Sequence, residues 1–229
     1  MPAKNRVKTY VEGGYYHIYN RGVEKRKIFL DQQDYNVFLS YLKEYLLPKD
    51  EEGLHKRLND PALSPRERDK ILKTLRMNNF SEEITLIAYC LMPNHFHFFV
   101  KQKNPMSIDK FMQSLATRYT MYFNRKHKRV GFLYQDIYKA VLITSEPQFI
   151  YLSKYIHKQA LSKLQGPTLQ GQPSSFADYI GERKTEWVNP EEVLSYFSKS
   201  NPSLSYKSFV LENPTEEEEI ILEKITLED

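Results

Sequence analysis

The spacing of apolar residues along this chain predicts four strands and several helices. Short apolar segments between glycines or turn residues predict strands at 13–22, 83–91, 95–101 and 140–143. In longer segments apolar residues recur three and four positions apart, which predicts helices at 29–47, 107–127 and 145–161 and shorter ones at 64–76 and 189–197. We therefore predict an α+β fold with a largely antiparallel, ferredoxin-like sheet and helices on one or both faces.

Two regions fall outside this pattern. Residues 48–80 are highly charged and contain three prolines, so they are interpreted as a charged helical insertion. Residues 164–229 are interpreted as a C-terminal extension, in which a loop or linker at 165–175 precedes a short helix and an acidic tail. Residues 1–163 form the predicted main domain, and the acidic tail is predicted to be partly disordered.

Charge is distributed unevenly along the chain, whose net value is +4. Residues 211–229 contain eight acidic residues and one lysine, which is −7, so residues 1–210 carry +11. A body this basic favours a polyanionic partner, because neutralising phosphates releases counterions. The alternative is a basic soluble protein without such a partner.

The single cysteine, Cys90, excludes an internal disulfide and a cysteine-based zinc cluster. No apolar run approaches the roughly 20 residues of a membrane-spanning helix, and the basic N-terminus lacks the apolar segment of a signal peptide. We therefore expect a cytoplasmic protein that makes no contact with a membrane.

The segment HFHFFV at 95–100 places two histidines at alternate positions of a strand. Side chains alternate between the faces of a sheet, so His95 and His97 share one face. They are either two partly buried residues that hydrogen-bond to neighbours or a pair that binds one cation. An isolated pair with this spacing does not decide between the two.

The helix predicted at 145–161 offers further ligands. At 100° per residue its buried stripe consists of Phe149, Leu152, Ile156 and Ala160. Tyr155 and Gln159 lie on one flank of this stripe, four residues apart and therefore on the same face. Two imidazoles and an amide oxygen could bind Mn²⁺, Mg²⁺ or another ion, and the ligands do not settle which.

The string YCLMPNHFHFFV at 89–100 closely resembles the histidine–hydrophobe–histidine signature of single-tyrosine HUH transposases. These are the insertion-sequence transposases and the tyrosine transposase-like proteins associated with repetitive extragenic palindromes (REP). YHIYNRG at 16–22, GFLYQDIYKA at 131–140 and YIHKQ at 155–159 resemble further segments of that family in the same order. The C-terminal strings PSSFADYIG at 173–181 and EWVNPEEVLSYF at 186–197 also resemble these proteins. The resemblance implies the HUH endonuclease fold.

Two positions depart from the palindrome-associated branch. Many of its members have Asn-Pro where this chain has Gln159 and Ala160, and a basic residue where this chain has Ile137. Glutamine at the first position resembles the insertion-sequence branch, in which it is a metal ligand.

The resemblance implies a transposase that nicks single-stranded DNA and transfers the strand. His95, His97 and Gln159 would hold a divalent metal, Mg²⁺ or Mn²⁺, and Tyr155 would be the nucleophile that forms a 5′-phosphotyrosine link. The implied partner is single-stranded or hairpin DNA, and members of the family act as monomers or as homodimers.

Basic residues near two predicted elements are candidates for DNA contact. They follow the first strand or lie along and after the helix at 107–127, and they are Arg21, Lys25, Arg26, Arg118, Arg125, Lys126, Lys128 and Arg129. Lys27 belongs to the first of these clusters. The alternative for each cluster is an ordinary solvated surface.

Three alternative functions remain open. The chain could be a catalytically inactive or domesticated nucleic-acid-binding protein of the same fold. It could be a metallohydrolase that uses the histidines without the tyrosine, which predicts no covalent adduct. It could also be a replication initiator or relaxase with related chemistry.

Overall fold

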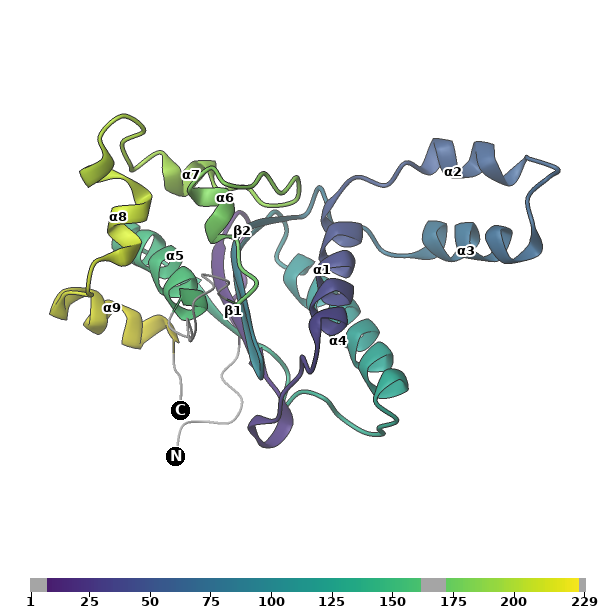
Figure 1. The fold of residues 1–229 in the computed structure, drawn as a ribbon, viewed down its shortest axis with the longest axis horizontal. Coiled ribbons are helices and arrows are strands. Elements are labelled where there is room, and N and C mark those ends of the chain that lie inside the picture. The colour runs from purple at the N-terminus through teal and green to yellow at the C-terminus, as the bar shows by residue number, and fades with distance from the viewer. Residues whose placement is uncertain (1–7, 162–171, 227–229) are drawn as a thin grey trace.

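A computed structural model describes residues 8–161 and 172–226 of the chain, and its centre is a four-stranded sheet. Helices lie on both sides of the sheet (Figure 1). The strands are β1 (Tyr15–Arg21), β2 (Ile84–Met92), β3 (His95–Gln102) and β4 (Lys139–Ile143). The longer helices are α1 (Gln32–Leu46), α4 (Ser107–Lys126) and α5 (Glu146–Leu161). The remaining elements are η1 (Val23–Lys25), α2 (Glu51–Leu58), α3 (Pro65–Arg76), α6 (Phe176–Tyr179), α7 (Glu191–Leu194), η2 (Pro202–Leu204), α8 (Tyr206–Leu211) and α9 (Glu216–Thr226).

The sheet is fully antiparallel and has the strand order β2-β3-β1-β4. The chain order β1-α1-β2-β3-α4-β4 with this arrangement is the ferredoxin-like motif, so the predicted fold class is confirmed. Helices α1 and α4 cover one face of the sheet, while α5 and the C-terminal helices lie on the other side (Figure 1). The sheet is therefore buried between two helical layers.

Alternate side chains of β3 point into two hydrophobic cores, one on each face of the sheet. Phe96, Phe98 and Val100 point into the core under α1 and α4, which also buries Phe38, Leu42, Phe111 and Tyr119. Phe99 points to the opposite face and packs with the α5 stripe of Phe149, Leu152, Ile156 and Ala160, as the helical periodicity predicted. Because the period of a strand is two, the residues that share a face with Phe99 include both histidines of β3.

The ends of the helices follow capping chemistry, with one correction. Asp31 caps α1 by accepting from the Asp34 N–H, and Ser145 accepts from the Gln148 N–H at the start of α5. The helix predicted at 107–127 begins with Ser107, a residue type that favours the N-cap position, but Ser107 is the first helical residue of α4 and Met106 is the N-cap. The Ser107 hydroxyl donates to the Glu83 carboxylate, which competes with a capping role.

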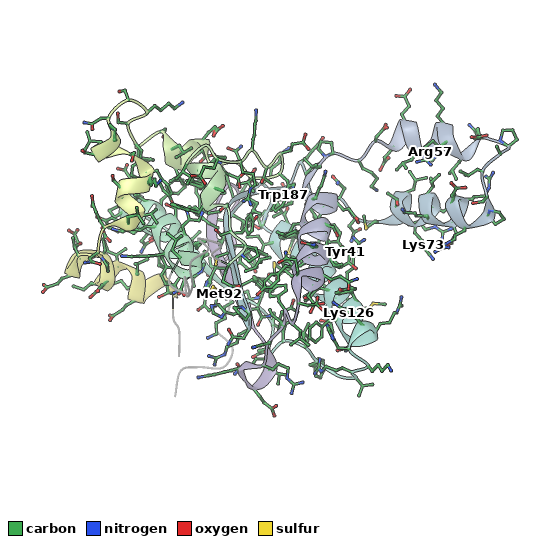
Figure 2. All side chains as sticks on the ribbon, in the orientation of Figure 1. Tyr41, Arg57, Lys73, Met92, Lys126 and Trp187 are labelled. Atoms are coloured by element: carbon green, nitrogen blue, oxygen red, sulfur yellow. The ribbon has the colours of Figure 1, made fainter. Side chains whose placement is uncertain are left out.

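The insertion at 48–80 forms a helical hairpin that projects from the molecule (Figure 1). Figure 2 labels Arg57 and Lys73 on its two helices. The predicted helix at 64–76 is confirmed as α3, which begins with a capping box between Ser64 and Glu67. The first helix of the hairpin, α2, was not predicted.

The C-terminal extension differs in part from the prediction. The acidic tail is not disordered over 216–226, because these residues form α9 and pack against α5. The helix predicted at 189–197 is shorter, since α7 covers Glu191–Leu194. The boundary predicted between residues 163 and 164 and most of the predicted linker lie outside the described residues. Across the two described ranges, no helix is long and apolar enough to span a membrane.

Candidate active site

The two histidines of β3 lie on the face of the sheet that α5 covers. His95 begins the strand and is half-buried, whereas His97 is fully buried. Their ring centroids lie 4.9 Å apart with the planes nearly perpendicular. Across the ladder, His95 pairs with Met92 of β2 and Arg21 of β1. Met92 therefore marks this end of the sheet in Figure 2.

The tautomer of His95 is set by Asn94. The Asn94 side-chain oxygen can only accept, so His95 Nδ1 donates to it over 2.7 Å. The lone pair of the neutral ring is then on Nε2, the nitrogen that a metal would take. The turn that carries Asn94 is itself held, because the Gly22 N–H donates to the Asn94 carbonyl over 2.8 Å.

His97 is oriented by a third histidine that the sequence analysis missed. The Ile225 carbonyl in α9 accepts from His17 Nδ1 over 2.8 Å. The other nitrogen of the neutral His17 ring therefore accepts from His97 Nδ1, 2.9 Å away. This places the lone pair of His97 on Nε2, as in His95. His17 is fully buried, and its signal in the sequence was an alternate position of the first strand, in YHIYNRG.

Tyr155 of α5 lies against the histidines. Its ring centroid is 5.4 Å from that of His97 and 6.0 Å from that of His17, edge to face in both cases. Packing of the buried α5 stripe on the sheet sets this position, and leaves Tyr155 half-buried on the flank. Gln159 lies one helical turn further on the same flank and is also half-buried. The structure thus brings the tyrosine helix and the histidine pair together.

The donor set fits a divalent metal with few protein ligands. In the ranges 8–161 and 172–226, no group of three or more histidine, cysteine, aspartate or glutamate side chains is placed to hold a metal ion. Two imidazoles with their lone pairs on Nε2 still form a nitrogen pair, and the Gln159 amide is the nearby residue type that could add an oxygen. Imidazole and oxygen ligands suit several divalent ions, including Mn²⁺.

The C-terminal extension holds α5 from its other side. Lys154 and Glu218 form a buried ion pair of 2.9 Å between α5 and α9. His157 is fully buried and bonds to the Tyr206 hydroxyl and to the Ser175 hydroxyl, at 2.6 and 2.7 Å. Burial lowers the pKa of His157 to about 3, so this ring is neutral near pH 7 and serves packing. These contacts fix the rotation of the helix that carries Tyr155.

Basic side chains gather at the end of the sheet beside His95. Arg21 pairs with His95 across the ladder and is half-buried. Lys25, in the turn after β1, is exposed, and Arg26 forms a surface ion pair with Glu24. The sequence analysis missed Lys139, which pairs with Tyr19 on the same face at the start of β4 and is exposed.

The candidates on α4 separate into two groups. Arg118 pairs with Glu44 of α1 at 2.6 Å and lies over the Tyr41 ring, in the layer opposite the histidines. Lys126 bonds to Asp31 and Asp34, and Figure 2 shows it near the end of α4. Both therefore serve the contact between α1 and α4. The three candidates at and beyond the end of the helix are more accessible: Arg125 and Lys128 are exposed and Arg129 is half-exposed.

One comparison matches part of the chain to a known family. The family model described as "Transposase IS200 like" matches residues 59–159. No curated protein sequence matches the chain. One similar solved structure is a REP-associated tyrosine transposase bound to a REP hairpin, with 12% identity and a TM-score of 0.49, covering 89% of this chain and 97% of that chain. Another is a Deinococcus radiodurans protein described as a transposase, with 14% identity and a TM-score of 0.36, covering 68% and 97%.

A ferredoxin-like sheet with paired histidines beside a tyrosine helix is the arrangement that the sequence predicted for a single-tyrosine transposase. The matched residues, 59–159, include His95, His97, Tyr155 and Gln159. This part of the chain therefore resembles IS200-like transposases, which are DNA-processing enzymes.

Proposed function

We propose that this protein nicks single-stranded DNA and transfers the strand through a 5′-phosphotyrosine intermediate, in a metal-dependent reaction. The observation that carries the proposal is the position of Tyr155, whose ring lies 5.4 Å from that of His97 on the face that also presents His95. The match of residues 59–159 to the IS200-like transposase family model supports the same reaction class.

His95, His97 and Gln159 are proposed to hold the divalent metal, Mg²⁺ or Mn²⁺. When bound, such an ion polarises the scissile phosphate and offsets charge in the transition state. Both histidines have the tautomer that a metal ligand requires, with the lone pair on Nε2, because Asn94 and His17 accept hydrogen bonds from their Nδ1 atoms. His17 therefore acts on the metal site as a positioning residue.

Tyr155 is the proposed nucleophile. Its phenolic oxygen attacks phosphorus, the bond from phosphorus to the 3′ oxygen breaks, and the phenolic proton is lost while the leaving strand gains a 3′-OH. The DNA 5′ end is then linked to the protein as a phosphotyrosine. Attack by a 3′-OH on this link joins the two DNA ends and restores the phenol, so the exchange needs no ATP.

The basic end of the sheet is the proposed DNA-binding surface. Arg21 lies beside His95, Lys25 lies in the turn after β1, and Arg125, Lys128 and Arg129 lie at or beyond the end of α4. Side chains of this type bind backbone phosphates without reading sequence. The substrate is proposed to be single-stranded DNA that contains a hairpin, bound in the cytoplasm by a monomer or a homodimer.

Capture of the covalent intermediate tests the proposal. The protein is incubated with 5′- or 3′-labelled hairpin oligonucleotides from the flanks of its own gene, with Mn²⁺ or Mg²⁺, and analysed on a denaturing protein gel. We expect a metal-dependent covalent band for the wild type and none for Tyr155→Phe. Tyr151→Phe is the matched control, because Tyr151 lies one turn earlier on α5 and stacks on Phe209.

The other outcomes separate the alternatives. Strand cleavage without a covalent band would indicate a metallohydrolase. DNA binding without cleavage would indicate an inactive or domesticated binding protein. Loss of the band in Tyr151→Phe but not in Tyr155→Phe would place the nucleophile elsewhere on α5.

A further inference from the structure

An exposed apolar cluster lies in residues 127–138, the rim loop, which connects α4 to β4. Val130 is 92% exposed, Phe132 87% and Ile137 72%, which makes them the three most exposed large apolar side chains of the described residues. The next is Leu204 at 62%, in the C-terminal extension. Scattered exposed apolar residues are ordinary, but three within eight positions of one loop indicate a binding surface.

The rim loop holds these side chains outward by a defined backbone. Gly131, between Val130 and Phe132, has a φ of +85°, which favours glycine. The Asn124 side chain donates to the Gly131 carbonyl over 2.8 Å. Leu133, the next residue after Phe132, is fully buried and anchors the loop in the core. The loop therefore keeps Phe132 exposed, because its neighbours Gly131 and Leu133 are held by a hydrogen bond and by burial in the core.

The rim loop borders the candidate active site. The Val23 N–H donates to the Leu133 carbonyl over 3.0 Å, and the Gln135 N–H donates to the Arg21 carbonyl over 2.9 Å. Arg21 is in turn the ladder partner of His95. In Figure 1 the loop runs from the lower end of α4 toward the turn after β1. The apolar cluster is therefore at the same end of the sheet as the metal-binding candidates.

The charge around the cluster selects its partner. Basic residues lie in the rim loop and in the segments joined to it. Exposed Lys128 and half-exposed Arg129 are in the loop and exposed Arg125 is near the end of α4 just before it, while exposed Lys25 and Lys27 lie in the turn after β1, to which the loop is hydrogen-bonded. The neighbouring acids are Glu24, which is paired with Arg26, and Asp136. An apolar protein surface would gain nothing from this excess of positive charge. A single strand of nucleic acid offers phosphates and base faces together.

We propose that the rim loop binds unpaired bases of the DNA strand next to the active site, with Phe132 as the stacking residue and Val130 and Ile137 as its apolar border. The inference rests on the proposed function. Aromatic side chains within a basic surface are the common means of binding single strands without sequence preference. Tyr119 and Phe123 of α4, by contrast, are fully buried and serve the core.

Binding to two hairpin oligonucleotides tests this inference without requiring cleavage. One hairpin carries unpaired flanks of about six nucleotides with 2-aminopurine, and the other is blunt. We expect Phe132→Ala to weaken binding of the flanked hairpin by about 5- to 150-fold, the range for loss of one base stack. Binding of the blunt hairpin should stay unchanged. Phe132→Trp should retain both the affinity and the quenching of 2-aminopurine.

Leu204→Ala is the matched control, because Leu204 is the next most exposed apolar residue and lies in the C-terminal extension. A second control is Lys128→Ala, whose loss of affinity should shrink as salt increases, while the loss in Phe132→Ala persists. Circular dichroism checks that each variant is folded.

Three outcomes would overturn the inference. Equal losses on both hairpins would mean that Phe132 supports the loop and not a base. Unchanged affinity for the flanked hairpin, with a change in self-association by sedimentation, would make the cluster an interface between copies. Failure of the wild type to bind either hairpin would remove the proposed function as well, whereas binding with no covalent adduct would remove only the chemistry.

Discussion

His17 shows how a buried side chain can act on a site without belonging to it. Both of its ring nitrogens are engaged, one by the Ile225 carbonyl and the other by His97 Nδ1. In a neutral His17 ring, a carbonyl at one end fixes the direction of both hydrogen bonds, since the carbonyl cannot donate. The consequence is one tautomer of His97, with Nε2 carrying the lone pair.

Replacing His17 should therefore weaken metal binding. We expect His17→Leu to reduce the affinity for Mn²⁺ by about 10- to 100-fold, the usual effect of losing an outer partner of a histidine ligand. His17→Gln keeps a side-chain oxygen that can accept from His97, so its loss should be smaller. Mn²⁺ titration followed by electron paramagnetic resonance measures both variants without DNA. Equal affinity of His17→Leu and the wild type would contradict the positioning role.

At the scale of elements, α5 lies between the sheet and the C-terminal extension. Its apolar stripe packs on Phe99 and the other residues of that face. Its opposite side is buried by α8 and α9, which place Glu218 against Lys154 and Tyr206 against His157. Packing on both sides fixes the rotation of α5 about its own axis. This rotation places Tyr155 next to the histidines.

The buried ion pair between Lys154 of α5 and Glu218 of α9 should lose more stability when one partner is replaced than when both are replaced. Lys154→Met leaves Glu218 buried without its cation, so we expect a loss of about 3 to 5 kcal/mol in the free energy of unfolding. Lys154→Met combined with Glu218→Leu should recover most of that loss. Lys73→Met, which breaks the exposed pair with Asp69, should cost less than about 1 kcal/mol. Urea unfolding measures all three, and a double variant no more stable than Lys154→Met alone would refute the coupling.

The contact between α1 and α4 should make stability depend on pH. Burial by itself raises the pKa of Asp34, but hydrogen bonds from Lys126 and the Leu30 N–H outweigh it and hold the pKa below its usual value. His127 and Tyr122 also bond to this carboxylate. A lowered pKa in the folded state stabilises the protein above the unfolded value near pH 4, and this stabilisation is lost as the pH falls below it.

Asp34→Asn isolates this contribution. We expect the variant to be less stable than the wild type at pH 7, with the difference shrinking as the pH falls from about 5 toward 3. Urea unfolding at several pH values measures it. A difference that stays constant over this range would show that Asp34 contributes through packing and not through its charge.

At the scale of the whole molecule, the projecting hairpin of α2 and α3 is attached through a narrow base. Lys49 donates to the Leu75 and Met77 carbonyls over 3.0 and 2.7 Å. The two segments of the hairpin are therefore joined to each other at its base. The core beneath begins with Phe80, which packs with Tyr45 and Phe111. The hairpin is thus an appendage of the sheet, as the charge and proline content of 48–80 predicted.

Removing the hairpin should spare the fold. When residues 50–76 are replaced by a short Gly-Ser linker, we expect the melting temperature to change by only a few degrees, because closing a loop between neighbouring ends costs little. Covalent adduct formation should also persist. Thermal unfolding and the gel assay measure the two properties. Loss of cooperative unfolding would show that the hairpin belongs to the core.

The sequence predicted the elements well because their signals are local. Helical periodicity located α1, α3, α4 and α5, and alternation in HFHFFV put His95 and His97 on one face. The errors have a common cause, which is that contacts between residues far apart in the chain outweigh the local signal. Ser107 has a capping residue type, but its hydroxyl bonds to Glu83. The acidic tail has the composition of disorder, but α9 buries Ile225 against α5 and the sheet.

By itself, the sequence determined the order of the strands and the longer helices, the buried stripe of α5, and the two histidines, the tyrosine and the glutamine that lie on the candidate site's elements. These follow from residue type and spacing along one segment. Only the tertiary structure decided that His17 orients His97, that α9 supplies its acceptor, and that Arg118 and Lys126 serve the fold while Phe132 faces solvent. Each of these depends on contacts between residues far apart in the chain, which no local periodicity encodes.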